Sequence, residues 1–68
     1  MNDDARRRII RRPRVREITG LGDSSLYERM AAGTFPRPVP LGGRAVGWIE
    51  SEVEEWIDAR IAEREAAA

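Results

Sequence analysis

The chain has 68 residues, and its 12 arginines balance its 12 acidic residues to give a formal net charge of zero. This length allows one domain with a small core. The absence of cysteine and histidine excludes disulfides and thiolate metal sites, and it removes the commonest general base and zinc ligand. No apolar run approaches the roughly 18 residues of a transmembrane helix, and no signal-peptide pattern opens the chain. We therefore expect a soluble cytoplasmic protein without a cofactor, a membrane segment or enzymatic activity.

The charge is distributed unevenly along the chain. Residues 1–48 contain ten arginines and five acidic residues, whereas residues 49–68 contain two arginines and seven acidic residues. This asymmetry indicates a basic half suited to nucleic acid and an acidic half that faces elsewhere. The use of arginine without lysine favours bidentate recognition of phosphate or guanine. The alternative explanation for the missing lysines is the nucleotide bias of a GC-rich genome.

A basic segment opens the chain. Residues 1–8 are predicted to be a disordered basic arm. The run RRRIIRRPRVR over residues 6–16 contains seven arginines. It indicates either an arm that follows DNA phosphates or a short strand through residues 9–12 with solvated flanks, and the two interpretations are compatible.

Two short helices joined by a glycine turn are predicted next. The first covers residues 14–19 and ends at Gly20. The second runs from Ser24 to Ala32, with Asp23 as its N-cap, and stops at Gly33. A helix, a turn and a second helix form the helix-turn-helix arrangement, whose second helix enters the DNA major groove. The same pattern also occurs in folds that do not bind DNA.

A β-hairpin is predicted from Gly42-Gly43, which lies between two extended runs. Pairing outward from this two-residue loop gives Leu41 opposite Arg44, Val39 opposite Val46 and Arg37 opposite Trp48. The same register places Val39, Leu41, Val46 and Trp48 on the face that packs against the helices. Arg44 then lies at the tip, where it can reach a phosphate or a narrow minor groove, or where it stays idle in solvent. Any third strand must pair with residues 44–48.

The last part of the chain has the period of a helix. Ser51 is its predicted N-cap. The core stripe is expected at Val53, Trp56, Ile57 and Ile61. This acidic helix is expected on the side away from DNA. Residues 62–68 have little to bury and are expected to fray, so the folded domain is predicted over residues 9–61.

Three segments of the chain follow a recognisable pattern: TGLGDSSLY (residues 19–27), GTFPRPVPLGGRAVGW (33–48) and SEVEEWI (51–57). Together with IIRRPRVREI, they resemble the AlpA-type phage and prophage regulators, which are relatives of excisionases and of MerR-like winged helix-turn-helix proteins. The resemblance covers about residues 9–57. It implies an α+β, mostly α fold, namely a small winged helix-turn-helix with three helices and a two-stranded β-hairpin wing.

The resemblance also implies a role and a set of positions. Such proteins bind DNA near phage or prophage genes, regulate transcription of excision or integration functions, or bend DNA in recombination. Ser24, Ser25 and Tyr27 match the recognition helix. Gly42, Gly43 and Arg44 match the wing tip. Phe35 and Trp48 match core positions that join the wing to the helices.

Two departures from the pattern bring negative charge to the surface expected to meet DNA. Gly22-Asp23 stands where relatives usually have serine followed by a basic or polar residue, and Glu28 stands where they often have arginine. A glutamate can accept a hydrogen bond from cytosine, whereas phosphate repels it. The alternative hypothesis is therefore a protein-interaction adaptor that keeps the winged fold but has lost strong DNA affinity.

The main hypothesis is a DNA-binding transcriptional regulator associated with the nucleoid. Its recognition helix would lie in the major groove, and its wing on the backbone or in the minor groove. The candidate DNA-binding residues are Arg12, Arg14, Ser24, Ser25, Tyr27, Glu28, Arg37, Gly42, Gly43 and Arg44. The expected partner is double-stranded DNA, and further candidates are copies of the chain on repeated sites and a recombinase or transcription partner.

Overall fold

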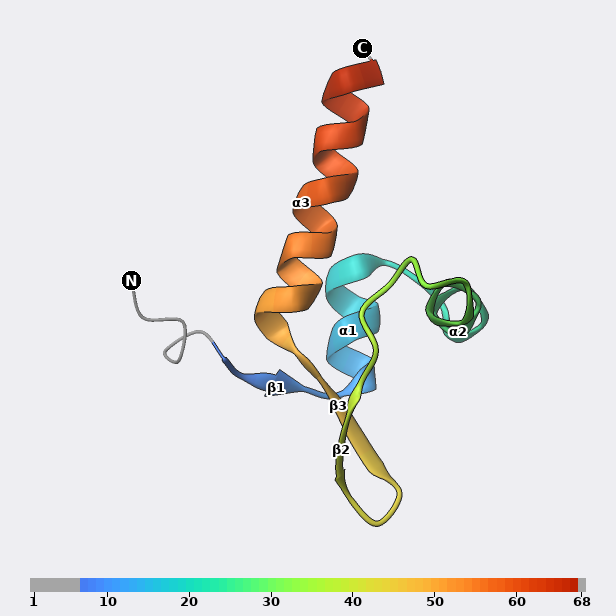
Figure 1. Cartoon of the computed structure of the whole chain (residues 1–68), viewed down its shortest axis with the longest axis vertical. Coiled ribbons are helices and arrows are strands. Elements are labelled where there is room, and N and C mark those ends of the chain that lie inside the picture. The colour runs from blue at the N-terminus through green and yellow to red at the C-terminus, as the bar shows by residue number, and fades with distance from the viewer. Residues whose placement is uncertain (1–6, 68) are drawn as a thin grey trace.

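The computed structural model describes residues 7–67, which form three helices and a three-stranded antiparallel sheet (Figure 1). In chain order the elements are β1 (Ile9–Ile10), α1 (Arg12–Thr19), α2 (Asp23–Ala32), β2 (Val39–Gly42), β3 (Ala45–Ile49) and α3 (Glu50–Ala67). The predicted small winged helix-turn-helix is therefore confirmed. Residues 1–6 of the predicted basic arm lie outside the described residues.

Glycines end both short helices, as the sequence predicts. Gly20 (φ 76°) and Gly33 (φ 79°) are in the left-handed conformation, and the N–H of each bonds back to a carbonyl of the last helical turn. The predicted cap at Asp23 is wrong. Gly22 is the N-cap of α2 and carries no side chain to bond to the helix end, and Asp23 is the first helical residue.

Five apolar side chains form the buried core of the described residues. They are Val15, Leu26, Phe35, Trp48 and Val53. Each comes from a different part of the chain, so all three helices and the central strand meet at one cluster. Half-buried residues, including Met30, Trp56 and Ile57, pack around this cluster. Ile61, predicted for the same stripe, is 44% exposed, because α3 has by then extended beyond the body of the domain.

The central strand of the sheet is β3, which lies between β1 and β2. The predicted third strand is present but shorter than predicted: it covers Ile9–Ile10 instead of residues 9–12, with Ile9 opposite Ile49 and Ile10 opposite Trp48. The other edge is β2, as its proline requires, because proline has no N–H to donate to a further strand.

The predicted register of the hairpin is wrong. The loop residues are Gly43 and Arg44, and the flanking strands pair Val39 with Gly47, Pro40 with Val46 and Gly42 with Ala45. The expected pairs Leu41–Arg44, Val39–Val46 and Arg37–Trp48 are thereby replaced. An irregularity between Pro40 and Gly42 takes up the difference. Glycine permits it, because Gly42 and Gly43 have φ values of 109° and 56° that other residues rarely adopt.

The changed register moves two side chains to the other face of the sheet. Val39 is paired with Gly47, so it lies on the face opposite Trp48. A Cβ atom on Gly47 would lie 3.2 Å from Cδ1 of Leu41, which places Leu41 on that face as well. The prediction that Val39 and Leu41 pack with Trp48 against the helices is therefore wrong.

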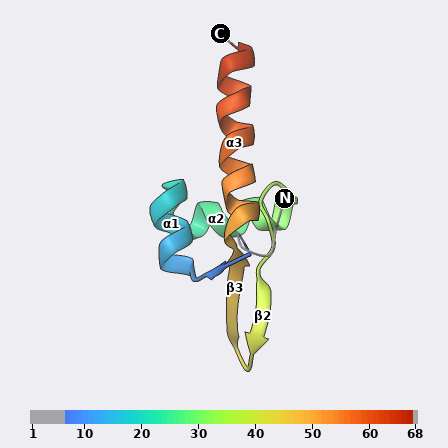
Figure 2. The same ribbon diagram turned by 90° about the vertical axis from the view of Figure 1, so that its left-hand side faces the viewer.

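The last strand continues directly into the last helix. The N–H of Glu50 donates a 2.7 Å hydrogen bond to the carbonyl of Arg8, and α3 begins there. Ser51 is therefore already helical, and its predicted role as N-cap is wrong. The hairpin and α3 extend in opposite directions from the body (Figure 2). Among residues 7–67, no helix is long and apolar enough to cross a membrane.

An ion pair fastens the N-terminal segment to the start of α3. The Glu50 side chain is only 12% exposed, and its carboxylate accepts hydrogen bonds from Nε (2.9 Å) and Nη2 (3.2 Å) of Arg8. The hydrogen bond from Arg8 lowers the pKa of Glu50, and the charges of Arg8 and Arg14 act in the same direction, whereas burial opposes them. The same contact raises the pKa of Arg8. Arg8, the last residue of the predicted arm, is thus held in place.

Gly47 is a position where a methyl group would not fit. An added Cβ would collide with Cγ2 of Ile9 and would lie 3.2 Å from the carbonyl oxygen of Ile10. We expect Gly47→Ala to lower the free energy of unfolding by about 1–3 kcal/mol in urea denaturation. Adding Ile9→Ala removes the colliding methyl and should recover part of this loss. A neutral Gly47→Ala, or no recovery in the double variant, would contradict the steric cause.

The Arg8–Glu50 pair predicts a dependence of stability on pH. Because the folded pKa of Glu50 is lowered, the pair stabilises above the unfolded pKa of about 4.3. That stabilisation is lost as the pH falls through the folded value. Glu50→Gln should therefore be less stable than wild type at pH 7, and the difference should shrink below about pH 4. Urea denaturation across pH measures it, with the exposed Glu63→Gln as control, and a gap that does not change with pH would refute this account.

Candidate nucleic-acid interface

The start of α1, the middle of α2 and the hairpin surround a hollow of about 300 Å³. Its lining residues are Arg11, Arg12, Pro13, Tyr27, Arg44, Val46 and Trp48. Three of these are arginines: Arg11 precedes α1, Arg12 begins it, and Arg44 lies in the hairpin loop. None of the lining residues is acidic. A concave surface lined by guanidinium groups and one phenol is suited to an anionic ligand such as a nucleic-acid backbone.

The exposed side of α2 carries the residues predicted for recognition. Ser24, Ser25, Tyr27 and Glu28 are all exposed. Leu26 is fully buried and Met30 half-buried on the other side, so the core fixes which side of α2 faces outward. Ser24 and Tyr27 are three residues apart and therefore share one face of the helix.

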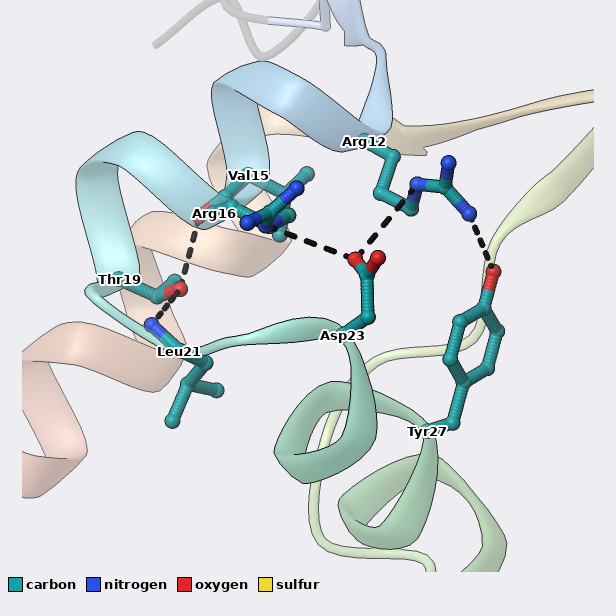
Figure 3. Close-up of polar contacts among 7 residues, drawn as sticks. All are labelled: Arg12, Val15, Arg16, Thr19, Leu21, Asp23 and Tyr27. Carbon is teal, nitrogen blue, oxygen red and sulfur yellow. Dashed lines mark hydrogen bonds and ion pairs between the residues drawn. The ribbon is translucent and has the colours of Figure 1, made fainter.

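The turn between α1 and α2 is fixed by a threonine (Figure 3). The Thr19 hydroxyl donates a 2.7 Å hydrogen bond to the carbonyl of Val15 and accepts a 3.2 Å bond from the N–H of Leu21. Leu21 packs against the core. These contacts set the position of α2 relative to α1.

A polar network joins α1 to α2 beside this turn (Figure 3). One carboxylate oxygen of Asp23 lies 3.7 Å from Nε of Arg12 and 3.5 Å from Nε of Arg16. Nη1 of Arg12 also donates a 3.2 Å hydrogen bond to the hydroxyl of Tyr27. This bond, followed by the charge of Asp23, raises the pKa of Arg12. The network thus connects a side chain of the hollow to the start of the predicted recognition helix.

The hairpin tip supplies the third side of the hollow. Gly42 ends β2, and Gly43 and Arg44 form the loop. Arg44 is exposed and borders the hollow. Although the register differs from the predicted one, Arg44 remains at the tip and faces the same hollow as Tyr27 and Arg12.

Residues 8–61 match the family described as Prophage CP4-57 regulatory protein (AlpA). The chain belongs to the AlpA family. It is similar to the DNA-binding transcriptional activator AlpA of Escherichia coli K12, with 36% identity over 66 residues, which cover 88% of this chain and 94% of the relative. It is also 44% identical to ORF88, an uncharacterised protein of Enterobacteria phage P4, over 62 residues, which cover 91% of this chain and 70% of the relative. The predicted resemblance is confirmed.

Two of the predicted arginines lie outside the hollow of this AlpA-family domain. Arg14 follows Arg12 by two residues, so it lies on nearly the opposite side of α1. There it donates a 2.8 Å hydrogen bond to Glu17. Arg37 lines a separate groove beside α3, together with the acidic residues Glu52 and Glu55.

Two further arginines, which were not among the predicted site residues, belong to the hollow or to the polar network beside it. Arg11, the N-cap of α1, borders the hollow, and Arg16 approaches Asp23. The four-residue spacing of Arg12 and Arg16 could have identified Arg16, because residues four apart share one face of a helix. That signal depends on a helix that begins at Arg12, two residues before the predicted start.

Proposed function

We propose that this AlpA-family chain is a transcriptional regulator that binds double-stranded DNA in the cytoplasm, on the nucleoid. In this proposal α2 enters the major groove from Ser24 onward, and the hairpin lies on the backbone or in the minor groove. The observation that carries the proposal is the hollow, where Arg11, Arg12 and Arg44 surround Tyr27.

The distribution of charge supports this proposal despite the net charge of zero. The acidic helix α3 extends from the body in the direction opposite to the hairpin (Figures 1 and 2), so it leads away from the hairpin tip of the proposed DNA surface. The similarity to the E. coli DNA-binding transcriptional activator AlpA supports the same role. Long-range attraction then depends on the basic side of the molecule rather than on its total charge.

The proposed contacts divide into two kinds. Arg11, Arg12 and Arg44 would bind phosphates, which positions the domain without reading sequence. The exposed side chains of α2, namely Ser24, Ser25, Tyr27 and Glu28, would face base edges. A small domain makes few such contacts, so we further propose that copies bind side by side on repeated sites, or act with a recombinase or transcription partner.

The adaptor hypothesis is favoured by one observation, the exposed carboxylate of Glu28 on the proposed recognition surface. Binding to a random duplex at low salt separates the two functions. A DNA-binding domain should bind it with a dissociation constant of about 100 μM or tighter. Complete absence of binding at that concentration would favour the adaptor, and a partner search would then replace the DNA experiments.

Substitution of the wing arginine should weaken binding to all DNA sequences. A phosphate contact carries no sequence information, so we expect Arg44→Ala to reduce affinity for selected and random duplexes by a similar factor. It should also lower the slope of log affinity against log salt by about 1. Fluorescence anisotropy over a salt series measures both quantities. Arg37→Ala removes the same charge beside α3 and should change them less, and the reverse order would refute the wing contact.

Substitutions on α2 should instead reduce discrimination. After a binding sequence has been selected from random DNA, Tyr27→Ala or Ser24→Ala should weaken that site on the order of 10- to 100-fold. The same variants should bind random duplex nearly as wild type does. Competition assays with both duplexes measure the ratio, with Arg44→Ala as the internal comparison. Equal loss on both duplexes would count against reading in the major groove.

A further inference from the structure

We propose that Asp23 is a positioning residue for DNA recognition. It holds Arg12 and Arg16 as an oriented pair and, through Arg12, fixes the Tyr27 hydroxyl, so that α1 and α2 read a duplex as one unit. This inference rests on the proposed DNA-binding function and deepens it. It assigns Asp23 to sequence discrimination, although a lone carboxylate on a DNA-facing surface would be expected only to repel phosphate.

The geometry of the contacts supports this role. A single oxygen, Oδ1 of Asp23, approaches Nε of both arginines, at 3.7 Å for Arg12 and 3.5 Å for Arg16. Contact through Nε leaves the terminal nitrogens of a guanidinium for other acceptors. Nη1 of Arg12 uses this freedom to donate to Tyr27. The carboxylate therefore orients the two arginines without occupying the groups that bind phosphates best.

Stabilisation of the fold does not account for the arrangement. The side chains of Asp23, Arg12 and Arg16 are each 48% exposed, and ion pairs with this exposure contribute little to stability. Their effect on binding is different, because two long side chains that are already ordered lose less freedom when they meet a ligand. Order present before DNA arrives favours the geometry of one site over the average geometry of random duplex.

Simple repulsion and positioning predict different results for Asp23→Asn. If Asp23 only repels phosphate, its removal should tighten binding to selected and random duplexes by the same factor. If it positions the arginines, random duplex should be bound more tightly while the selected site is not, and the ratio of the two affinities should fall about tenfold. Anisotropy titrations of both duplexes with wild type and variant measure this ratio.

A matched control is available on α1. Glu17→Gln removes one negative charge and releases Arg14 on the other side of the helix, so its charge change equals that of Asp23→Asn. The ratio of affinities should stay at the wild-type value in this variant. A fall as large as that of Asp23→Asn would mean that lost charge alone reduces discrimination, and it would overturn the proposal.

The link through Tyr27 can be measured with a double-mutant cycle. Tyr27→Phe removes the hydroxyl that accepts from Arg12 and keeps the ring. Because Asp23 and Tyr27 act through the same guanidinium, the loss of discrimination in the double variant should be smaller than the product of the single losses. Independent, multiplicative losses would overturn the link.

The free protein provides a readout that does not depend on DNA. Relaxation of the arginine Nε–H groups in NMR should show that Asp23→Asn makes Arg12 and Arg16 more mobile and leaves Arg14 unchanged. Unchanged mobility of Arg12 and Arg16 would overturn the positioning role. A wild-type protein that binds no duplex would overturn the proposed function, whereas wild-type discrimination that survives Asp23→Asn would overturn this inference alone.

Discussion

The burial of Trp48 is the contact on which the arrangement of this domain depends. Its indole is fully buried at the end of the central strand, and its Nε1 donates a 3.1 Å hydrogen bond to the carbonyl of Pro36, in the connection that leads to β2. The same residue pairs with Ile10 of β1. It also borders the hollow between the helices and the hairpin. Trp48 thus links β1, through its backbone, and the connection before β2, through its indole, to the core shared with the helices.

The arginines of the chain divide between structure and surface, which is why their number overstates the charge offered to a ligand. The guanidinium groups of Arg29 and Arg60 lie 5.7 Å and 5.2 Å from the ring of Trp56. The Nε1 of Trp56 donates a 2.7 Å hydrogen bond to the carbonyl of Thr34. The Arg29 cation attaches the last turn of α2 to α3, whereas Arg60 lies on α3 itself, one turn after Trp56. Arg8 attaches the N-terminal segment through Glu50. A basic surface remains where Arg11, Arg12 and Arg44 meet.

The sequence predicts those features that one residue type imposes through its own backbone. Gly20 and Gly33 end helices because the left-handed conformation excludes most other residues, and Pro40 keeps its strand at the edge. The hairpin register cannot be predicted in this way. Gly42 and Gly43 allow more than one turn, and the choice between them involves the distant packing of Ile9 and Leu41 beside Gly47.

The candidate site can be predicted only as well as the helix boundaries, because these boundaries fix the direction in which each helical side chain points. Tyr27, Arg12 and Arg44 are candidates from the sequence, and the structure places all three at the hollow; their contact with DNA stays a prediction. Arg14 lies elsewhere because two residues along a helix reverse the direction of a side chain, and α1 begins at Arg12, two residues before the predicted start. Asp23 has the local pattern of an N-cap, but α2 begins one residue earlier than predicted, so Gly22 is the N-cap and the Asp23 carboxylate lies near the guanidinium groups of α1. Local propensity is a weak guide to such helix boundaries.

The two acidic departures from the AlpA-type pattern therefore differ in physical character. Asp23 has guanidinium groups 3.5 Å and 3.7 Å away, so the cluster of two arginines and one carboxylate keeps a net positive charge toward a phosphate. Glu28 is exposed on α2, so in a complex with DNA its carboxylate would meet a base edge or a phosphate directly. A carboxylate accepts a hydrogen bond from the amino group of cytosine and finds no partner on guanine in the major groove. Of the two substitutions, Glu28 is consequently the one able to change which sequence is bound, and Asp23 the one able to change how firmly the reading groups are held.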